Sequence, residues 1–119
     1  MLSQAVQPQS MSNERRQASR YSVEARLRAR VRCSGATRTV HGQGSDISTG
    51  GMAVYLPYEL AVGETIELEF ALPYASEPLK VLAVVRSRRS YQYGVEFTNL
   101  SAGVLSAIKR ACASLALVQ

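Results

Sequence analysis

The sequence has no tryptophan, one histidine and two cysteines among its 119 residues. Cys33 and Cys112 lie far apart, and neither a CxxC pair nor a second histidine accompanies them. The sequence therefore lacks the set of ligands that a zinc site needs and the residues that a cysteine–histidine nucleophile needs. We expect no metal, no cofactor and no enzymatic activity. Both cysteines fall on apolar faces of predicted elements, so we expect buried, reduced thiols.

Long apolar stretches are also missing. No run approaches the roughly 18 apolar residues that a membrane span needs, and the N-terminus lacks the charged and apolar regions of a signal peptide. These absences predict no membrane insertion and a cytoplasmic location. The length suits one domain. Residues 1–13 are polar and without periodicity, which predicts a flexible arm ahead of a domain over 14–119.

Lysine is scarce, whereas arginine is abundant. Only Lys80 and Lys109 are lysines among the 14 basic residues, which outnumber 9 acidic ones and give a net charge of +5. Arginine presents a planar fork of donors that matches phosphates and base edges, whereas lysine acts as a point charge. The segment from Arg15 to Arg38 is rich in arginine, and Glu59 to Glu77 is acidic. This asymmetry predicts a localised anion site.

Hydrophobic periodicity predicts an all-β fold. Polar and apolar residues alternate from Ser22 to Cys33, which is typical of a long strand with one buried face. Further strands are expected over 38–43, 52–56, 66–72, 79–88 and 93–97, the fifth more central and the last two a hairpin. Helical spacing follows over 104–115, with Asn99 or Ser101 as the N-cap. We predict a small six-stranded antiparallel β-barrel with a C-terminal helix across one opening.

Two short motifs are candidates for function. Arg16 and Arg20 form an RxxxR motif between the arm and the first strand, and 46–51 reads DISTGG, a DxSxxG motif. Alone, the first is typical of a solvated basic linker. The second is typical of an ordinary turn, in which Asp46 and Ser48 cap their own backbone and the glycines take positive φ.

In this order the two motifs resemble the signature of the PilZ domain family. The segment 93–97, YGVEF, and the segment 99–101, NLS, are further matches, and the resemblance covers Glu14 to Ala113. It implies a six-stranded barrel in a bacterial protein that binds the second messenger cyclic di-GMP. The ligand-binding residues that we predict are Arg15, Arg16, Arg20, Asp46, Ser48, Gly50, Gly51, Arg86 and Arg88.

The chemistry of these residues suits the ligand. The guanidinium forks of Arg16 and Arg20 match phosphate and the O6/N7 edge of guanine. Asp46 offers acceptors to guanine N–H groups, Ser48 offers a hydroxyl, and the two glycines let backbone amides approach. Arg86 and Arg88 are expected to share one face of the fifth strand near the turn. The resemblance implies that an arginine at position 15 favours two ligands per protomer.

Other polar residues are expected at the surface. The arginines at 26, 28, 30 and 32 form the outer face of the first strand, and His41 is a surface residue. The tyrosines are expected in the core or at the rim, although an exposed one could stack on a base.

We favour a non-enzymatic receptor whose arm becomes ordered on cyclic di-GMP and presents a surface to a protein effector that the sequence does not identify. One alternative is a PilZ-like interaction module that binds no nucleotide. A barrel that binds single-stranded nucleic acid is the other, but the arginine face of the first strand carries no aromatic residue. We therefore expect no DNA or RNA partner.

Overall fold

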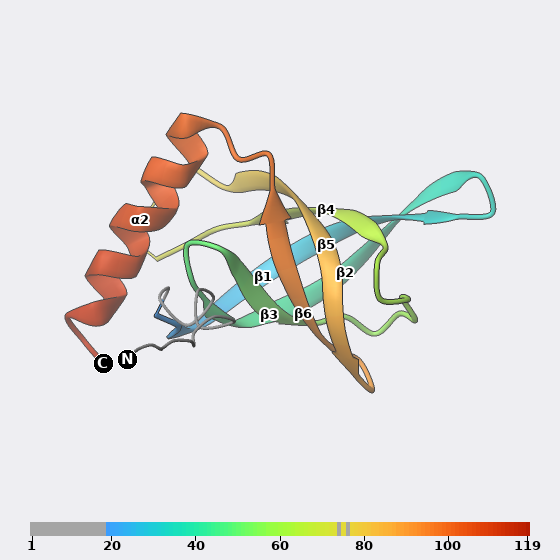
Figure 1. Ribbon diagram of the computed structural model, residues 1–119, viewed down its shortest axis with the longest axis horizontal. Coiled ribbons are helices and arrows are strands. Elements are labelled where there is room, and N and C mark those ends of the chain that lie inside the picture. Colours follow the sequence, from blue (N-terminus) through green and yellow to red (C-terminus); the bar gives the residue numbers. More distant parts are fainter. Residues whose placement is uncertain (1–18, 74, 76) are drawn as a thin grey trace, which may run out of the picture.

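The computed structural model describes residues 19–73, 75 and 77–119. Its elements are β1 (Tyr21–Cys33), β2 (Ala36–Ile47), β3 (Gly51–Tyr55), β4 (Thr65–Phe70), β5 (Leu79–Arg89), β6 (Gln92–Thr98) and α2 (Ala102–Ala116), shown in Figure 1. All neighbouring strands are antiparallel, and they close into a barrel in the order β1-β2-β3-β6-β5-β4. The prediction of a six-stranded antiparallel barrel with a C-terminal helix is therefore confirmed.

Closure joins the first strand to the fourth. β1 pairs with β2 along nearly its whole length and with β4 over Leu27–Arg30. In a closed barrel each strand has two neighbours, so the expectation that β5 is a more central strand is wrong. Its second apolar face lies on the outside, where Leu82 is 44% exposed.

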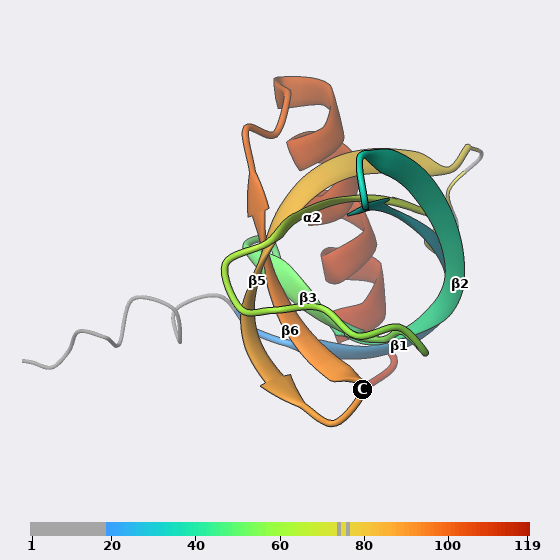
Figure 2. The same ribbon diagram turned by 90° about the vertical axis from the view of Figure 1, so that its right-hand side faces the viewer.

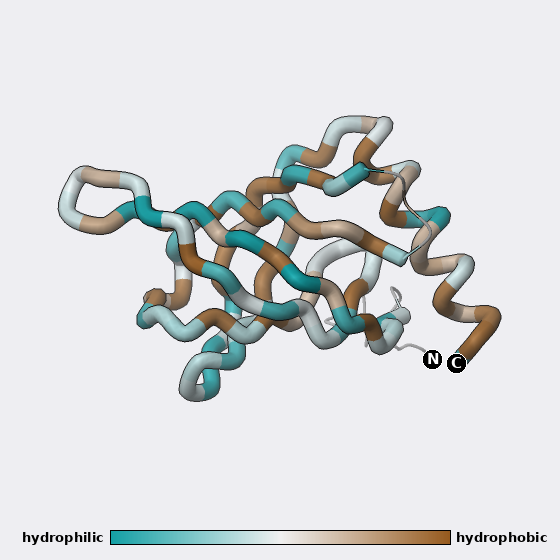
Figure 3. Tube along the Cα trace, turned by 180° about the vertical axis from the view of Figure 1, so that it is seen from behind, coloured by the Kyte–Doolittle hydropathy of each residue, from teal (hydrophilic) through white to brown (hydrophobic). Residues whose placement is uncertain are grey.

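The core fills the barrel with alternate residues of every strand. In β1 the side chains at 23, 25, 27, 29 and 31 are buried and those between them are exposed. The same alternation appears along the strands in Figure 3. Every second β1 residue leaves water in this way, and burial of apolar area is the main favourable term in folding.

The helix covers one end of the barrel. Figure 2 shows α2 behind the ring of strands. Its buried residues are Ile108, Ala111, Cys112 and Leu115. Ser101 is the N-cap, and its Oγ accepts from the Val104 N–H at 3.2 Å. Burial raises the pKa of the Cys112 thiol, as expected for a buried, unreactive cysteine. Cys33 is only half-buried, so its predicted burial is wrong: it sits at the end of β1, beyond the core.

The β1–β2 hairpin projects beyond the barrel (Figure 1). Ser34 and Gly35 form its turn with φ of 51° and 80°, which suits the right-handed twist of the strands. Nearer the barrel, Val23 and Glu24 of β1 stand opposite Ser45 alone, because the register shifts between Ser22 and Ala25. Ser45 is also the extra residue of β2 against β3. Such bulges bend strands and redirect side chains.

Tyr93 ties the β3–β4 loop to the core. Its ring is 1% exposed, and its hydroxyl accepts from the Leu60 N–H at 2.9 Å and donates to the Tyr58 carbonyl at 2.7 Å. Tyr93 thus lies in the core, one of the two places expected for the tyrosines.

The change Tyr93→Phe should destabilise the protein, because it leaves the buried Leu60 N–H without an acceptor. A loss of about 1–3 kcal/mol is expected, which lowers the melting temperature by at least about 4 °C. Thermal unfolding followed by circular dichroism measures this. Tyr91→Phe is the control, since Tyr91 is 42% exposed. Equal melting temperatures for both variants would contradict the structural role of the Tyr93 hydroxyl.

Candidate ligand-binding site

The DxSxxG motif forms the turn between β2 and β3. The Ser48 Oγ accepts from the Gly50 N–H at 3.2 Å and lies 3.4 Å from the Gly51 carbonyl, to which the Ser48 N–H also donates at 2.8 Å. Ser48 is 8% exposed. Its hydroxyl therefore shapes the turn from within and does not point outward, and the Gly50 amide is already engaged.

Gly51 is required by the close approach of β6. A Cβ on Gly51 would collide with the Val95 carbonyl oxygen, and Gly51 is registered opposite Glu96. Neither Gly50 nor Gly51 has a positive φ, so the ordinary-turn interpretation is wrong on that point. The Gly50 carbonyl accepts from the Phe97 N–H at 2.9 Å. The turn is thus fastened to β6 as well as to itself.

Asp46 connects this turn to the second arginine of the RxxxR motif. Its Oδ1 accepts from Arg20 Nη1 at 3.0 Å and from the Ala53 N–H at 3.2 Å. The pairing of Ser22 with Asp46 brings the start of β1 beside the end of β2. The Arg20 side chain is 62% exposed and that of Asp46 30%. The two motifs therefore meet in space, with the cation facing outward.

Arg15 and Arg16 lie outside the described residues, as does the whole of the expected arm over 1–13. Arg20 is the one arginine of the RRxxxR segment that the structure places. Two residues further along β1, the backbone of Ser22 exchanges two hydrogen bonds with the side-chain amide of Gln119, at 2.9 Å and 2.7 Å. The start of β1 is thus held at the edge that does not pair with β2.

Arg86 and Arg88 do not share one face of β5, contrary to expectation. The register of β5 against β6 shifts between Val85 and Ser87, so Arg86 is an extra residue. Arg86 bonds the exposed Glu96 at 2.7 Å, one strand away from the turn.

Arg88 instead lies over the Tyr93 ring, at 5.7 Å from its centroid. It donates to the carbonyls of Ser90 and Leu60 at 2.9 Å and 3.2 Å. Arg88 therefore fastens loops at the end of β6 away from the turn, and only Arg86 of the two stands near the motif.

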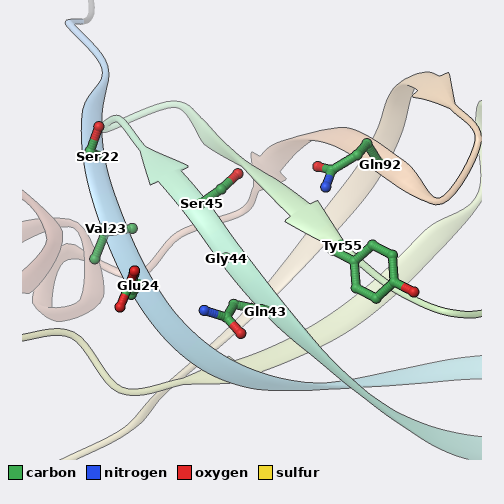
Figure 4. A pocket seen from close by; sticks show the side chains of 8 residues that line it. All are labelled: Ser22, Val23, Glu24, Gln43, Gly44, Ser45, Tyr55 and Gln92. Carbon is green, nitrogen blue, oxygen red and sulfur yellow. The ribbon is translucent and has the colours of Figure 1, made fainter.

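A hollow of about 560 Å³ opens on the outside of the barrel (Figure 4). It lies beside Asp46, because Ser22, the β1 partner of Asp46, and Ser45, its neighbour in β2, both line it. Its polar lining comes from β1, β2, β3 and β6: Ser22, Glu24, Gln43, Ser45, Tyr55 and Gln92. Tyr55 is 42% exposed. Apart from the general expectation for tyrosines, sequence reasoning missed this group. Its members are ordinary outward-facing strand residues, and only the strand order brings them together.

The remaining polar residues lie as expected at the surface. Arg28 pairs with Glu69 at 2.7 Å and Arg30 with Glu67 at 3.5 Å, so β4 neutralises half of the arginine face of β1. His41 is exposed. Among the described residues, no cluster of metal-binding side chains is found. In the same part of the chain, no helix is long and apolar enough to cross a membrane.

Comparisons with solved structures agree with this barrel. The inhibitor of motility from Bacillus subtilis superimposes with a TM-score of 0.70 at 22% identity, over 87% of this chain and 52% of its own. The PilZ domain of YcgR from Escherichia coli, solved with cyclic di-GMP, gives 0.66 at 20% identity, over 87% and 92%. The PilZ domain of CeSA from a cellulose-synthesizing bacterium gives 0.60 at 19%, over 77% and 92%.

This chain spans about half the length of the Bacillus subtilis protein. No curated protein matches the sequence. The PilZ domain model, however, matches residues 14–114, which include both motifs, all six strands and most of α2. On this match, the chain belongs to the PilZ domain family.

Proposed function

We propose that this protein is a cyclic di-GMP receptor that acts as an adaptor. PilZ domains are effector domains and not enzymes, so the expected output is a change of surface. The observation that carries the proposal is the exposed Arg20–Asp46 pair beside the turn, where both motifs meet. Support comes from the PilZ domain of YcgR, which has this fold and was solved with cyclic di-GMP.

The Arg20–Asp46 contact is weak enough to be exchanged for a ligand. Surface ion pairs contribute about 0–1 kcal/mol, and the Arg20 side chain is more than half exposed. A phosphate offers the guanidinium a stronger, forked contact. Arg20 can therefore turn to a phosphate at little cost while Asp46 stays fixed by the Ala53 N–H.

Each motif residue takes one part in this proposal. Arg16 and Arg20 bind phosphate and the O6/N7 edge of guanine, and the second oxygen of Asp46 accepts from guanine N–H groups. Ser48, Gly50 and Gly51 act by shaping the turn, given the hydrogen bonds within it. Arg88 does not contact the ligand in this proposal, because its donors bind carbonyl oxygens at the other end of β6.

The proposed output is the ordering of the segment before β1. In this proposal the arginines at positions 15 and 16 gain partners when phosphates arrive, and the segment folds over the ligand. The resulting surface is then recognised by a protein effector. Motility inhibition by the longer Bacillus subtilis protein is a property of that protein.

Removal of Arg20 should weaken binding specifically. Arg20→Ala and Arg16→Ala are expected to raise the dissociation constant for cyclic di-GMP at least tenfold, measured by isothermal titration calorimetry with GTP as a second ligand. Arg28→Ala is the matched control: it removes an equally charged, 54%-exposed arginine of β1 that also pairs with a carboxylate. Equal losses in all three variants would show that bulk charge binds the ligand. No heat with the unaltered protein would favour the nucleotide-free interaction module.

Asp46→Asn should reduce affinity without unfolding the protein. The amide oxygen can still accept from the Ala53 N–H, but the charge that holds Arg20 and attracts guanine N–H groups is gone. We expect at least a fivefold weaker affinity and a melting temperature within about 4 °C of the unaltered protein. Tighter binding would mean that Asp46 merely competes with the ligand for Arg20.

Arg15 should set the stoichiometry. Two stacked ligands bring four phosphate charges together, and a third guanidinium offsets their repulsion; Arg86, near the turn, supplies a further cation. We propose two ligands per protomer, with Arg15→Leu lowering the calorimetric ratio towards one and sparing the first binding event. A ratio near one for the unaltered protein at saturating ligand would refute the pair but not the receptor.

A further inference from the structure

The hollow beside Asp46 differs in charge from the arginine end of the site. Among the described residues that line it, none is an arginine or a lysine, and one of them, Glu24, is an acid. Arg20 stands next to the hollow, beyond Ser22. A phosphate therefore finds its cation at the Arg20 end, whereas the hollow itself suits a neutral group that offers hydrogen-bond donors.

Two bulges lie at the hollow, and Glu24 belongs to one of them. Val23 and Glu24 share the place opposite Ser45, and Ser45 is itself the extra residue against β3. In Figure 4 the Glu24 side chain stands beside that of Gln43 on the neighbouring strand. Glu24 is exposed. Within the described residues no arginine, lysine or histidine lies within 4.0 Å of its carboxylate, unlike those of Asp46, Glu67 and Glu69.

An exposed carboxylate in such a place matches guanine better than the other nucleobases. Guanine presents two parallel donors, N1–H and the 2-amino group, which a carboxylate accepts with both oxygens. Adenine has an acceptor at N1 and no 2-amino group. Asp46 serves at most one guanine, because its Oδ1 already accepts two N–H groups. A ligand with two guanines therefore has a donor pair left for Glu24.

Tyr55 gives the same hollow an aromatic surface. Tyr55 is 42% exposed and pairs in register with Gln43 on β2 and with Gln92 on β6. Stacking of a base on an exposed aromatic ring is favourable and tolerates any base. β1 and β3 flank β2 and therefore lie two strand spacings apart, roughly 10 Å. A base that lies over β2 can reach Glu24 with its edge and Tyr55 with its face.

We propose that this hollow is the base-specificity pocket of the site. Glu24 accepts the N1–H and 2-amino donors of a guanine and so selects guanine over adenine, and Tyr55 stacks on the base. This inference rests on the proposed function, since it assumes that a cyclic dinucleotide binds at Arg20 and Asp46. It adds a specificity residue outside both sequence motifs.

The test compares two cyclic dinucleotides that differ only in their bases. Glu24→Gln keeps the shape of the side chain but replaces one acceptor by an N–H₂ donor, which opposes the guanine donors. Calorimetry should show cyclic di-GMP binding at least tenfold weaker in this variant and cyclic di-AMP binding changed less than twofold. Glu67→Gln is the control for loss of a carboxylate, because Glu67 lies on β4, outside the hollow, and pairs with Arg30 of β1. This variant should leave both affinities unchanged.

Tyr55 has a different expected signature. Tyr55→Ser should weaken both dinucleotides about equally, by at least fivefold, and Tyr55→Phe should restore both. Circular dichroism checks that each variant melts within about 4 °C of the unaltered protein, as expected for exposed residues.

Three results would overturn the inference alone: an unchanged or tighter affinity of Glu24→Gln for cyclic di-GMP, an equal loss for both dinucleotides in that variant, or unaltered binding in Tyr55→Ser. If the unaltered protein binds no cyclic dinucleotide, the proposed function falls, and the pocket assignment falls with it. The two failures are therefore distinguished by the first titration.

Discussion

One carboxylate oxygen, Oδ1 of Asp46, organises the candidate site. It accepts from Arg20, which directly precedes β1, and from the Ala53 N–H on β3, while its own residue is the last but one of β2. Arg20 and Asp46 are 26 residues apart in sequence, and the β1–β2 register is what brings them together. The Ala53 contact holds the acceptor in place whether or not Arg20 is bound, so the cation can exchange partners without disturbing the barrel.

The rest of the site follows from how rigidly its parts are fixed. The turn is fastened by Ser48 from within and by β6 through Gly50 and Gly51. The start of β1 is held by the Gln119 side chain on one edge and by β2 on the other. Among the described residues, Arg20 itself makes only a surface pair, with Asp46. A rigid turn beside a loosely held cation is what a receptor needs, because preorganised contacts reduce the cost of binding and a free side chain can respond.

Periodicity predicted the barrel well, because alternating burial is written directly into β1 and helical spacing into α2. Bulges are not visible in that way. The β5 bulge separates Arg86 from Arg88, and the β1 bulge sets both Val23 and Glu24 opposite Ser45. Nor does the motif show that the Ser48 hydroxyl faces its own turn. Such features depend on register between distant segments, which a local pattern does not contain.

The distribution of charge separates this site from a general nucleic-acid surface. On β1, Arg28 and Arg30 face Glu69 and Glu67 of β4, so part of the arginine stripe is neutralised by the protein itself. A surface that binds single strands needs a continuous basic groove with aromatic residues along it. Here the exposed Tyr55 instead lines a hollow whose described lining contains neither arginine nor lysine. The site therefore has a cationic side at Arg20 and an uncharged or acidic side at the hollow. A nucleotide has the matching two parts, an anionic phosphate and an uncharged base.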